Sequence, residues 1–271
     1  MKQIFIPLLM LFLVPCRMVA LTVGNPGYET LKSRLQVSAE YQRENTEIKQ
    51  ESAPPFRMNS NRLLVKFSSS FVDGWSLGLL LGGSDMNVDY SSRSLSDYNG
   101  SWELAFGAES KNHYWDFCLG NRGEYGVLRS YFAVDYLTTL TRGKATRGAD
   151  TYYKISYRWN EFGGGVYWLY ENPWYTNLVF YFGGEWHNVE GKIHYERYFK
   201  SSQMSKSDGY FYVPTLYPKP MVGLDIILPN RYTLSFELRF WDKHSTSLTI
   251  GVSQIGEAQK RSCGECQSYY E

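Results

Sequence analysis

Residues 31–42 read LKSRLQVSAEYQ, and apolar and polar side chains alternate through this stretch. Val37, Ala39 and Tyr41 fall on one side, whereas Glu40 and the other residues between them fall on the opposite side. Successive side chains of a β-strand point to opposite faces, so a period of two predicts a strand with one apolar face and one wet face.

The same alternation recurs along most of the chain. It predicts strands at 31–42, 62–72, 75–83, 101–108, 113–120, 127–140, 151–160, 164–170, 176–187, 189–198, 220–228, 231–241 and 245–255. Turn-forming residues give short connections at 73–74, 110–112, 171–173 and 229–231. Longer connections are expected at 43–61, 84–100 and 199–219.

Strands of this kind build the barrels of bacterial outer membranes, whose strands are apolar toward lipid and polar toward the lumen. We therefore predict an all-β fold, an antiparallel transmembrane β-barrel over residues 21–255. The predicted segments are odd in number, whereas such barrels have an even number of strands, so we expect about twelve strands, with ten to fourteen open. Gly163–Gly165 is either a turn or a bulge inside one long strand. A secreted β-sandwich rich in tyrosine is the alternative fold.

The two ends of the chain carry different signals. Residues 1–20 resemble a cleaved signal peptide, with Lys2 at the charged start, an apolar stretch and a cleavage site after Ala20. Cys16 leaves lipid attachment as an alternative. Residues 256–271 form a polar tail that contains a Cys-x-x-Cys motif. Export together with the alternation predicts the cell outer membrane, with its lipid as a partner.

The overall composition supports a membrane interface and argues against nucleic acid. Aromatic residues make up 17% of the chain, including 23 tyrosines and 8 tryptophans, and tyrosine and tryptophan favour the membrane–water boundary. The net charge is +1 and basic residues do not cluster, so a nucleic-acid partner is not expected.

The charged residues on the polar faces are the main candidates for function. By alternation, the residues that line the lumen are predicted to be Lys66, Glu103, Asp116, Lys154, Arg158, Glu185, Asp225, Glu237 and Arg239. A barrel of about twelve strands has room for a water-filled passage, in which these charges set the ion preference. Their near balance predicts a porin-like passive channel for ions and small solutes, with weak selectivity. The alternative is that they pair across the interior and close it.

Histidine and cysteine give weaker candidates. Asp242 and His244 are spaced like a base and its orienting acid in a hydrolase, but no serine stands at a matching position, so no enzyme is expected. No metal-ligand spacing or phosphate loop occurs, and no cofactor is expected. Cys118, Cys263 and Cys266 remain after signal removal, an odd number that favours disulfides between chains. Whether Cys118 pairs with the tail is open.

The residues after the predicted cleavage site, Leu21-Thr-Val-Gly-Asn-Pro-Gly27, resemble the mature start of the chlamydial major outer membrane protein, a family of β-barrel porins. The resemblance covers seven residues. It implies an outer-membrane, porin-like protein that forms homo-oligomers or is linked by disulfides to envelope partners, in which Cys263 and Cys266 take part. This chain is shorter than members of that family and does not end in an aromatic residue. A closed structural or adhesive barrel that acts through its surface loops is the alternative function, and a membrane-embedded hydrolase is the second alternative.

Overall fold

The computed structural model describes residues 35–50, 53–72, 74–89, 98–120, 124–147, 149–175, 177–213, 218–229, 232–242 and 245–254. These ranges contain eleven β-strands: β1 (Leu35–Gln50), β2 (Ala53–Val72), β3 (Trp75–Val88), β4 (Tyr98–Cys118), β5 (Val127–Arg147), β6 (Thr151–Glu171), β7 (Leu178–Phe199), β8 (Ser202–Val213), β9 (Lys219–Leu228), β10 (Tyr232–Asp242) and β11 (Ser245–Gln254). Within the described ranges, no helix is long and apolar enough to cross a membrane.

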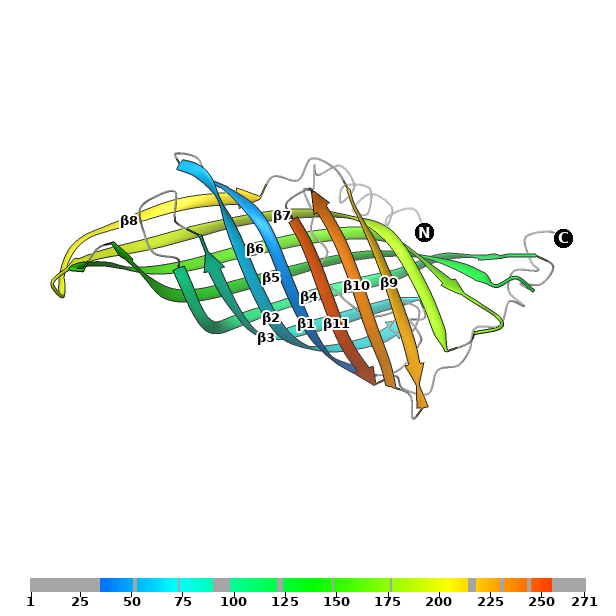
Figure 1. Ribbon diagram of the computed structural model, residues 1–271. Helices are drawn as coiled ribbons and strands as arrows, with labels where there is room; N and C mark the ends of the chain where they lie inside the picture. Colours follow the sequence, from blue (N-terminus) through cyan, green and yellow to red (C-terminus); the bar gives the residue numbers. More distant parts are fainter. Residues whose placement is uncertain are drawn as a thin grey trace, which may run out of the picture.

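The strands form one antiparallel sheet that closes on itself (Figure 1). β1 pairs with β2 on one side and with β11 on the other, which completes the ring. β7 pairs with β9 along residues 178–185 and with β8 along residues 189–199. β8 and β9 therefore lie one after the other along the same edge of β7 and together count as one strand position in the ring. The eleven described strands therefore fill ten positions, an even number, as antiparallel closure requires. The predicted barrel is confirmed, and its strand number falls within the expected range.

The predicted strand boundaries need correction in the middle of the chain. The predicted turn at 110–112 lies inside β4, and the predicted break at residue 188 lies inside β7. Gly163–Gly165 lies inside β6, which pairs with both neighbours there without a register shift. Polar residues at these places resemble turns in the sequence. A strand accommodates them because its backbone is already hydrogen-bonded and their side chains reach water or other charges.

The predicted long connections are also largely strand. β1 and β2 occupy most of 43–61, β3 and β4 occupy both ends of 84–100, and β8 lies within 199–219. Among the predicted turns, 73–74 is correct: Val72 pairs with Trp75 across it, and Gly74 has a φ of 86°. At the predicted turn 171–173, Glu171 ends β6 and the next two residues follow it; at the predicted turn 229–231, Pro229 follows β9 and the other two residues lie outside the described ranges. Above the membrane, strands need no apolar outer face, so the alternation fades while the strands continue.

The middle of the barrel is apolar outside and polar inside. On β1, Tyr41 is 38% exposed, whereas its neighbour Glu40 is 1% exposed. We call the outward apolar residues of this zone the apolar belt; it includes Val37, Tyr41, Leu63, Phe67, Leu77, Leu79, Leu81, Leu104, Phe106, Phe132, Phe162, Phe180, Phe182, Val222, Phe240, Leu248 and Val252. Exposed aromatic residues border it, with Trp75, Tyr114, Trp115 and Tyr232 toward the end that holds the strand termini Leu35 and Gln254, and Trp102, Tyr136 and Trp186 on the other side. Such rims mark the two membrane–water interfaces.

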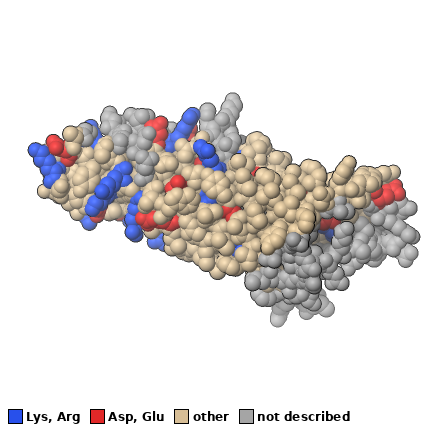
Figure 2. Space-filling view, turned by 60° about the horizontal axis from the view of Figure 1, so that its bottom comes forward, with Lys and Arg blue, Asp and Glu red and all other residues tan. Residues whose placement is uncertain are grey.

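Four strands continue far beyond the belt. β7 has 22 residues, about twice the 9–11 that cross a bilayer. We call residues 141–147, 151–160, 188–199 and 202–213 of β5 to β8 the outer sheet; β8 marks its place in Figure 1. Since these barrels are longer on their extracellular side, we infer that the outer sheet projects from the cell. Charged side chains gather toward this end of the molecule (Figure 2).

Candidate functional site in the barrel interior

The structure brings together five of the nine predicted lumen residues in the interior. Lys66, Glu185, Asp225, Glu237 and Arg239 point inward and are almost fully buried. They belong to a charged layer that also contains residues outside the predicted set. Its members are the acids Glu40, Glu44, Glu109, Asp135, Glu161, Glu185, Asp225 and Glu237 and the bases Arg62, Lys66, Lys111 and Arg239.

The other four predicted residues lie elsewhere. Glu103 is half-buried beside a register shift in β4, where its carboxylate lies 3.7 Å from Arg142. Asp116 is half-buried near the end that holds the strand termini, and pairs with His113 and Arg129. Lys154 and Arg158 are exposed on the outside of β6, so their prediction as lumen residues was wrong.

The error on β6 has a physical cause. Residues 151–160 lie in the outer sheet, where water surrounds the barrel and the apolar side chains turn inward as in a soluble protein. Ile155, Tyr157 and Trp159 are therefore buried in the interior rather than facing lipid. The period of two identifies a strand and its two faces, but only the position relative to the membrane decides which face is outside.

On the side of the charged layer nearest the outer sheet, Arg62 contacts carboxylates from two other strands. Its Nη2 lies 3.0 Å from Oε2 of Glu44 on β1, and its Nη1 donates a 3.0 Å hydrogen bond to Oε2 of Glu161 on β6. β2 and β6 are not neighbours in the sheet, so the second contact crosses the interior. The guanidinium also lies 5.9 Å from the ring centroid of Trp159. All of these side chains are 5% exposed or less.

Two further basic groups extend the layer around the ring. The Nζ of Lys66 lies 3.1 Å from Glu40 on β1 and 3.1 Å from Glu109 on β4, so it also links strands that are not neighbours. Arg239 on β10 pairs with Glu237 and places its Nε 3.1 Å from Glu185 on β7. The hydroxyl of Tyr167 donates a 2.7 Å hydrogen bond to the same glutamate. Side-chain charges are tolerated at this degree of burial only when they are paired and hydrogen-bonded.

Apolar side chains fill the interior on the outer side of the charged layer. We call this group the outer core; its buried members include Ile48, Phe56, Met58, Met86, Val88, Tyr98, Ala145, Ile155, Tyr157, Trp159, Val189, Ile193 and Phe211. Tyr157 packs edge to face against both Tyr98 and Phe211, with centroid distances of 5.0 and 5.9 Å. The outer core has the composition of a protein interior rather than of an aqueous channel.

A smaller group occupies the interior toward the end that holds the strand termini. Tyr131, Tyr167, Leu169, Val179, Tyr181 and Met221 form a second buried cluster. Arg129 lies beyond it, with its Nε 3.1 Å from Glu171 and with Asp116 as a second partner. The interior therefore has an apolar layer on each side of the charged layer.

The alternation already marks several residues missing from the predicted set. Glu40 and Glu44 lie on the polar side of β1, on either side of Gln42, and Gln42 is the residue that pairs with Arg62 on the polar side of β2. Lys111 was missed because 110–112 resembled a turn, and Glu161 because it fell between two predicted strands. Counting every inward charge of an uninterrupted β4 and β6 recovers both.

The remaining candidates fall mainly outside the described residues. The signal peptide at 1–20, the tail at 256–271 with Cys263 and Cys266, and His244 all lie there. Cys118 is half-buried in β4, and Asp242 ends β10. Across the described ranges, no group of three His, Cys, Asp or Glu is arranged to hold a metal ion.

No protein-family model matches this chain, and no curated protein does. Among solved structures, the chain is similar to the translocator domain of the autotransporter NalP from Neisseria meningitidis, with 12% identity, a TM-score of 0.46 and 84% of this chain and 90% of that one covered. It is also similar to an outer membrane channel from Pseudomonas putida F1, with 11% identity, a TM-score of 0.40 and 87% and 100% covered. The outer membrane protease OmpT from Escherichia coli gives 9% identity, a TM-score of 0.44 and 82% and 96% covered.

These similarities are too distant to transfer an activity. The class of protein follows from the closed antiparallel ring, the apolar belt with its aromatic rims and the buried charged interior. The chain is an outer-membrane β-barrel protein. The resemblance of residues 21–27 to the chlamydial porin family lies outside the described residues and stays a prediction.

Proposed function

We propose that this protein is a closed outer-membrane barrel that acts through its outer sheet, by contacting a protein at the cell surface. The supporting observation is the burial of the interior. Tyr157 and Trp159 of the outer core are 0% exposed, and Arg62 of the charged layer is 1% exposed. Residues that lined a water-filled passage at these levels would have measurable exposure. The alternative in which interior charges pair and close the barrel therefore fits better than a porin.

The outer sheet offers features suited to a protein partner. β8 pairs with β1 only through Phe211 and Tyr212, so residues 202–210 have no second strand partner within the described ranges. Met204 and Tyr210 on this strand are 63% and 61% exposed. An open strand edge binds extended segments through main-chain hydrogen bonds, and methionine and tyrosine are enriched at protein interfaces.

Planar-bilayer conductance of the mature chain, residues 21–271, tests the closure. We expect no discrete steps from protein whose insertion is proven by protease protection of the belt. The matched variant Tyr157→Ala/Trp159→Ala removes two rings from the outer core and should produce steps, which shows that the assay detects an opened barrel. Steps from the wild-type chain would refute the closed barrel.

Protease treatment of intact cells tests the display of the outer sheet. We expect cleavage at the β7–β8 turn, because Lys200 and Ser201 are exposed and both have a positive φ. Cleavage at this turn should leave a folded barrel, since residues 178–185 of β7 still pair with β9. A turn that is cut only in lysed cells would contradict display at the surface.

A passive channel is the second candidate, and one observation favours it. The hydroxyls of Ser76, Thr139 and Thr249 are buried without a hydrogen-bond partner in the described part of the chain, so water in the interior would satisfy them. Conduction would then require displacement of the outer core. The charged layer has more acids than bases, so such a channel would prefer cations rather than show the weak selectivity expected from the sequence.

A further inference from the structure

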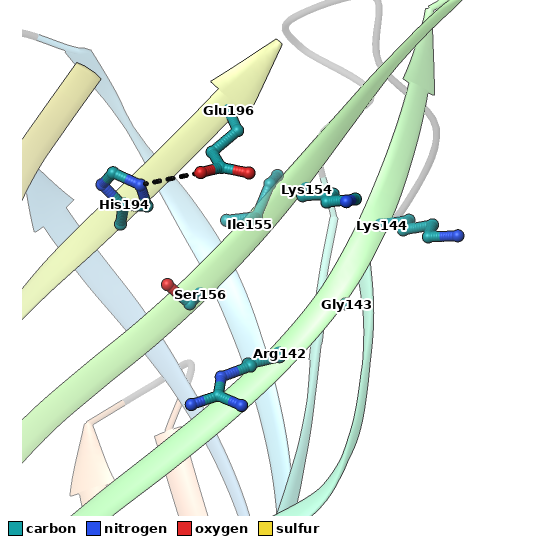
Figure 3. Close-up of a pocket in the computed structure, with 8 residues that line it drawn as sticks. All are labelled: Arg142, Gly143, Lys144, Lys154, Ile155, Ser156, His194 and Glu196. Atoms are coloured by element: carbon teal, nitrogen blue, oxygen red, sulfur yellow. Dashed lines mark ion pairs between the residues drawn. The ribbon is translucent and has the colours of Figure 1, made fainter. Parts of the chain in front are cut away.

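A basic pocket lies on the outside of the outer sheet, across β5, β6 and β7 (Figure 3). Its volume is about 410 Å³, and its ionisable lining groups are Arg142, Lys144, Lys154, His194 and Glu196. Figure 3 shows the two lysine side chains extending in the same direction, with Arg142 directed toward the other side of the pocket. The barrel interior described above plays no part in this site.

The two lysines are an unfavourable pair in the absence of a ligand. Lys144 and Lys154 are directly opposite each other in the β5–β6 ladder, and both point outward. Like charges at directly opposed positions destabilise a sheet. Their ammonium groups lie over aromatic rings instead of carboxylates, Lys144 at 5.9 Å from the centroid of Tyr152 and Lys154 at 4.6 Å from that of Tyr198.

The aromatic rings hold the lysines in place. Tyr152 and Tyr198 stack with an interplanar angle of 2° and a centroid distance of 4.9 Å. The Nζ of Lys154 also donates a 3.4 Å hydrogen bond to the hydroxyl of Tyr198. A cation over an aromatic face keeps its hydrogen-bonding capacity for a ligand on the open side.

The acid of the pocket is engaged by other groups. Glu196 lies 3.0 Å from the Nζ of Lys206 and accepts a 2.9 Å hydrogen bond from Tyr198. These hydrogen bonds, that of Lys206 first, hold the pKa of the Glu196 carboxyl at about 2, so it is ionised and paired at neutral pH. Arg142 lies 3.7 Å from Glu103 and keeps 67% of its side chain exposed. The pocket therefore has a net excess of positive charge that its own acid does not balance.

The pocket begins where the apolar belt ends. On the outward face of β5, the apolar Leu140 is followed by Arg142 at the next outward position. On the neighbouring strand β6, Arg158 pairs with Leu140. Lipid headgroups lie at this level of a membrane protein. An anion in the pocket can thus be carried by a lipid of the outer leaflet or come from solution.

We propose that this pocket binds a phosphate group through Lys144 and Lys154. Phosphate provides several acceptor oxygens and two negative charges, which match the donors and the charges of two lysines. One anion between the lysines turns the repulsion of the ladder pair into two attractions. This site does not rest on the proposed function, since it can be occupied whether or not the outer sheet contacts a protein.

Binding to the full mature chain in detergent tests the proposal, with two probes measured by calorimetry. One probe is inorganic phosphate, and the other is dihexanoyl phosphatidic acid, a phosphate monoester on a short lipid. The test variant is Lys144→Gln/Lys154→Gln. The control variant is Lys49→Gln/Lys200→Gln, which removes the same charge from exposed positions outside the pocket. We expect at least a tenfold loss of affinity in the test variant and none in the control.

The two probes separate the sources of the phosphate. Binding of both means a site for phosphate in general, and binding of the lipid alone means a headgroup site. Failure of the wild-type chain to bind either probe, or equal binding by the test variant, would overturn the proposal. A folding measurement complements the affinity. At low salt without phosphate, the test variant should melt at the same or a higher temperature than the wild-type chain, and added phosphate should raise the melting temperature of the wild-type chain alone.

Discussion

Removal of the Arg62 guanidinium should destabilise the barrel far more than removal of an exposed arginine. Arg62 has two carboxylate partners at 3.0 Å, from Glu44 and Glu161. At an effective dielectric constant near 20, each contact corresponds to about 5 kcal/mol of Coulomb energy, against a desolvation cost of several kcal/mol for each ion. The Arg62→Met variant leaves two carboxylates in the interior without this cation, so we expect a loss of about 3–5 kcal/mol in the free energy of unfolding.

Urea unfolding in lipid vesicles, followed by tryptophan fluorescence, measures this loss. The matched control is Arg158→Met, at an exposed position on β6, for which we expect a change of about 0–1 kcal/mol. A double-mutant cycle of Arg62→Met with Glu161→Gln should give a clear coupling energy, because the pair crosses the interior. A loss below about 1 kcal/mol for Arg62→Met would show that water solvates the charged layer, and would refute the closed interior.

Three further predictions concern orientation, packing and pH. The first uses a chain whose own cysteines are replaced by serine and a maleimide that does not cross membranes. On intact cells, Arg158→Cys should react with this reagent, whereas Lys66→Cys should stay unlabelled. The reverse pattern would invalidate the assigned faces. Gly183→Ala should prevent folding or lower the melting temperature strongly, because a Cβ there would lie 2.3 Å from a backbone oxygen of β6. The control variant Gly184→Ala should refold normally, because the nearest contact of its Cβ would be at 3.6 Å. Gel mobility measures the refolding of both variants. The pKa of the Glu196 carboxyl is lowered from 4.5 to about 2, so the contribution of its ion pair to the outer sheet is complete above about pH 4.5 and is lost as the pH falls from there through about 2. Backbone hydrogen exchange in β7 and β8, compared at matched intrinsic rates, should therefore show equal protection at pH 7 and pH 5. A loss of protection at pH 5 would be inconsistent with this ion pair.

The alternation of side chains was sufficient to predict a closed antiparallel barrel. On β10, Thr233, Ser235 and Glu237 were expected on the polar face, and all three are buried in the interior. In a membrane every strand must be hydrogen-bonded on both edges, so many strands with one apolar and one polar face have few arrangements open to them other than a closed barrel.

The residues that the sequence misplaced have a common origin. Lys154 and Arg158 belong to β6, whose outward side is apolar at Phe162 and charged a few residues away. Periodicity contains no information about where the membrane ends, so it could not show that the faces exchange their polarity along one strand. The contact of Arg62 with Glu161 was equally hidden, because it depends on which strands face each other across the ring.

The exchange of polarity along β5 and β6 also fixes the depth of the protein in the bilayer. Arg142, Lys144, Lys154 and Arg158 form a border of cations directly above the belt. Sliding toward the periplasm would draw them into hydrocarbon, where each arginine or lysine costs up to about 2–4 kcal/mol near the midplane. This cost keeps the barrel from sliding toward the periplasm, and it also opposes passage of the outer sheet back through the membrane. Once assembled, the barrel is held at one height by the solvation of its own side chains.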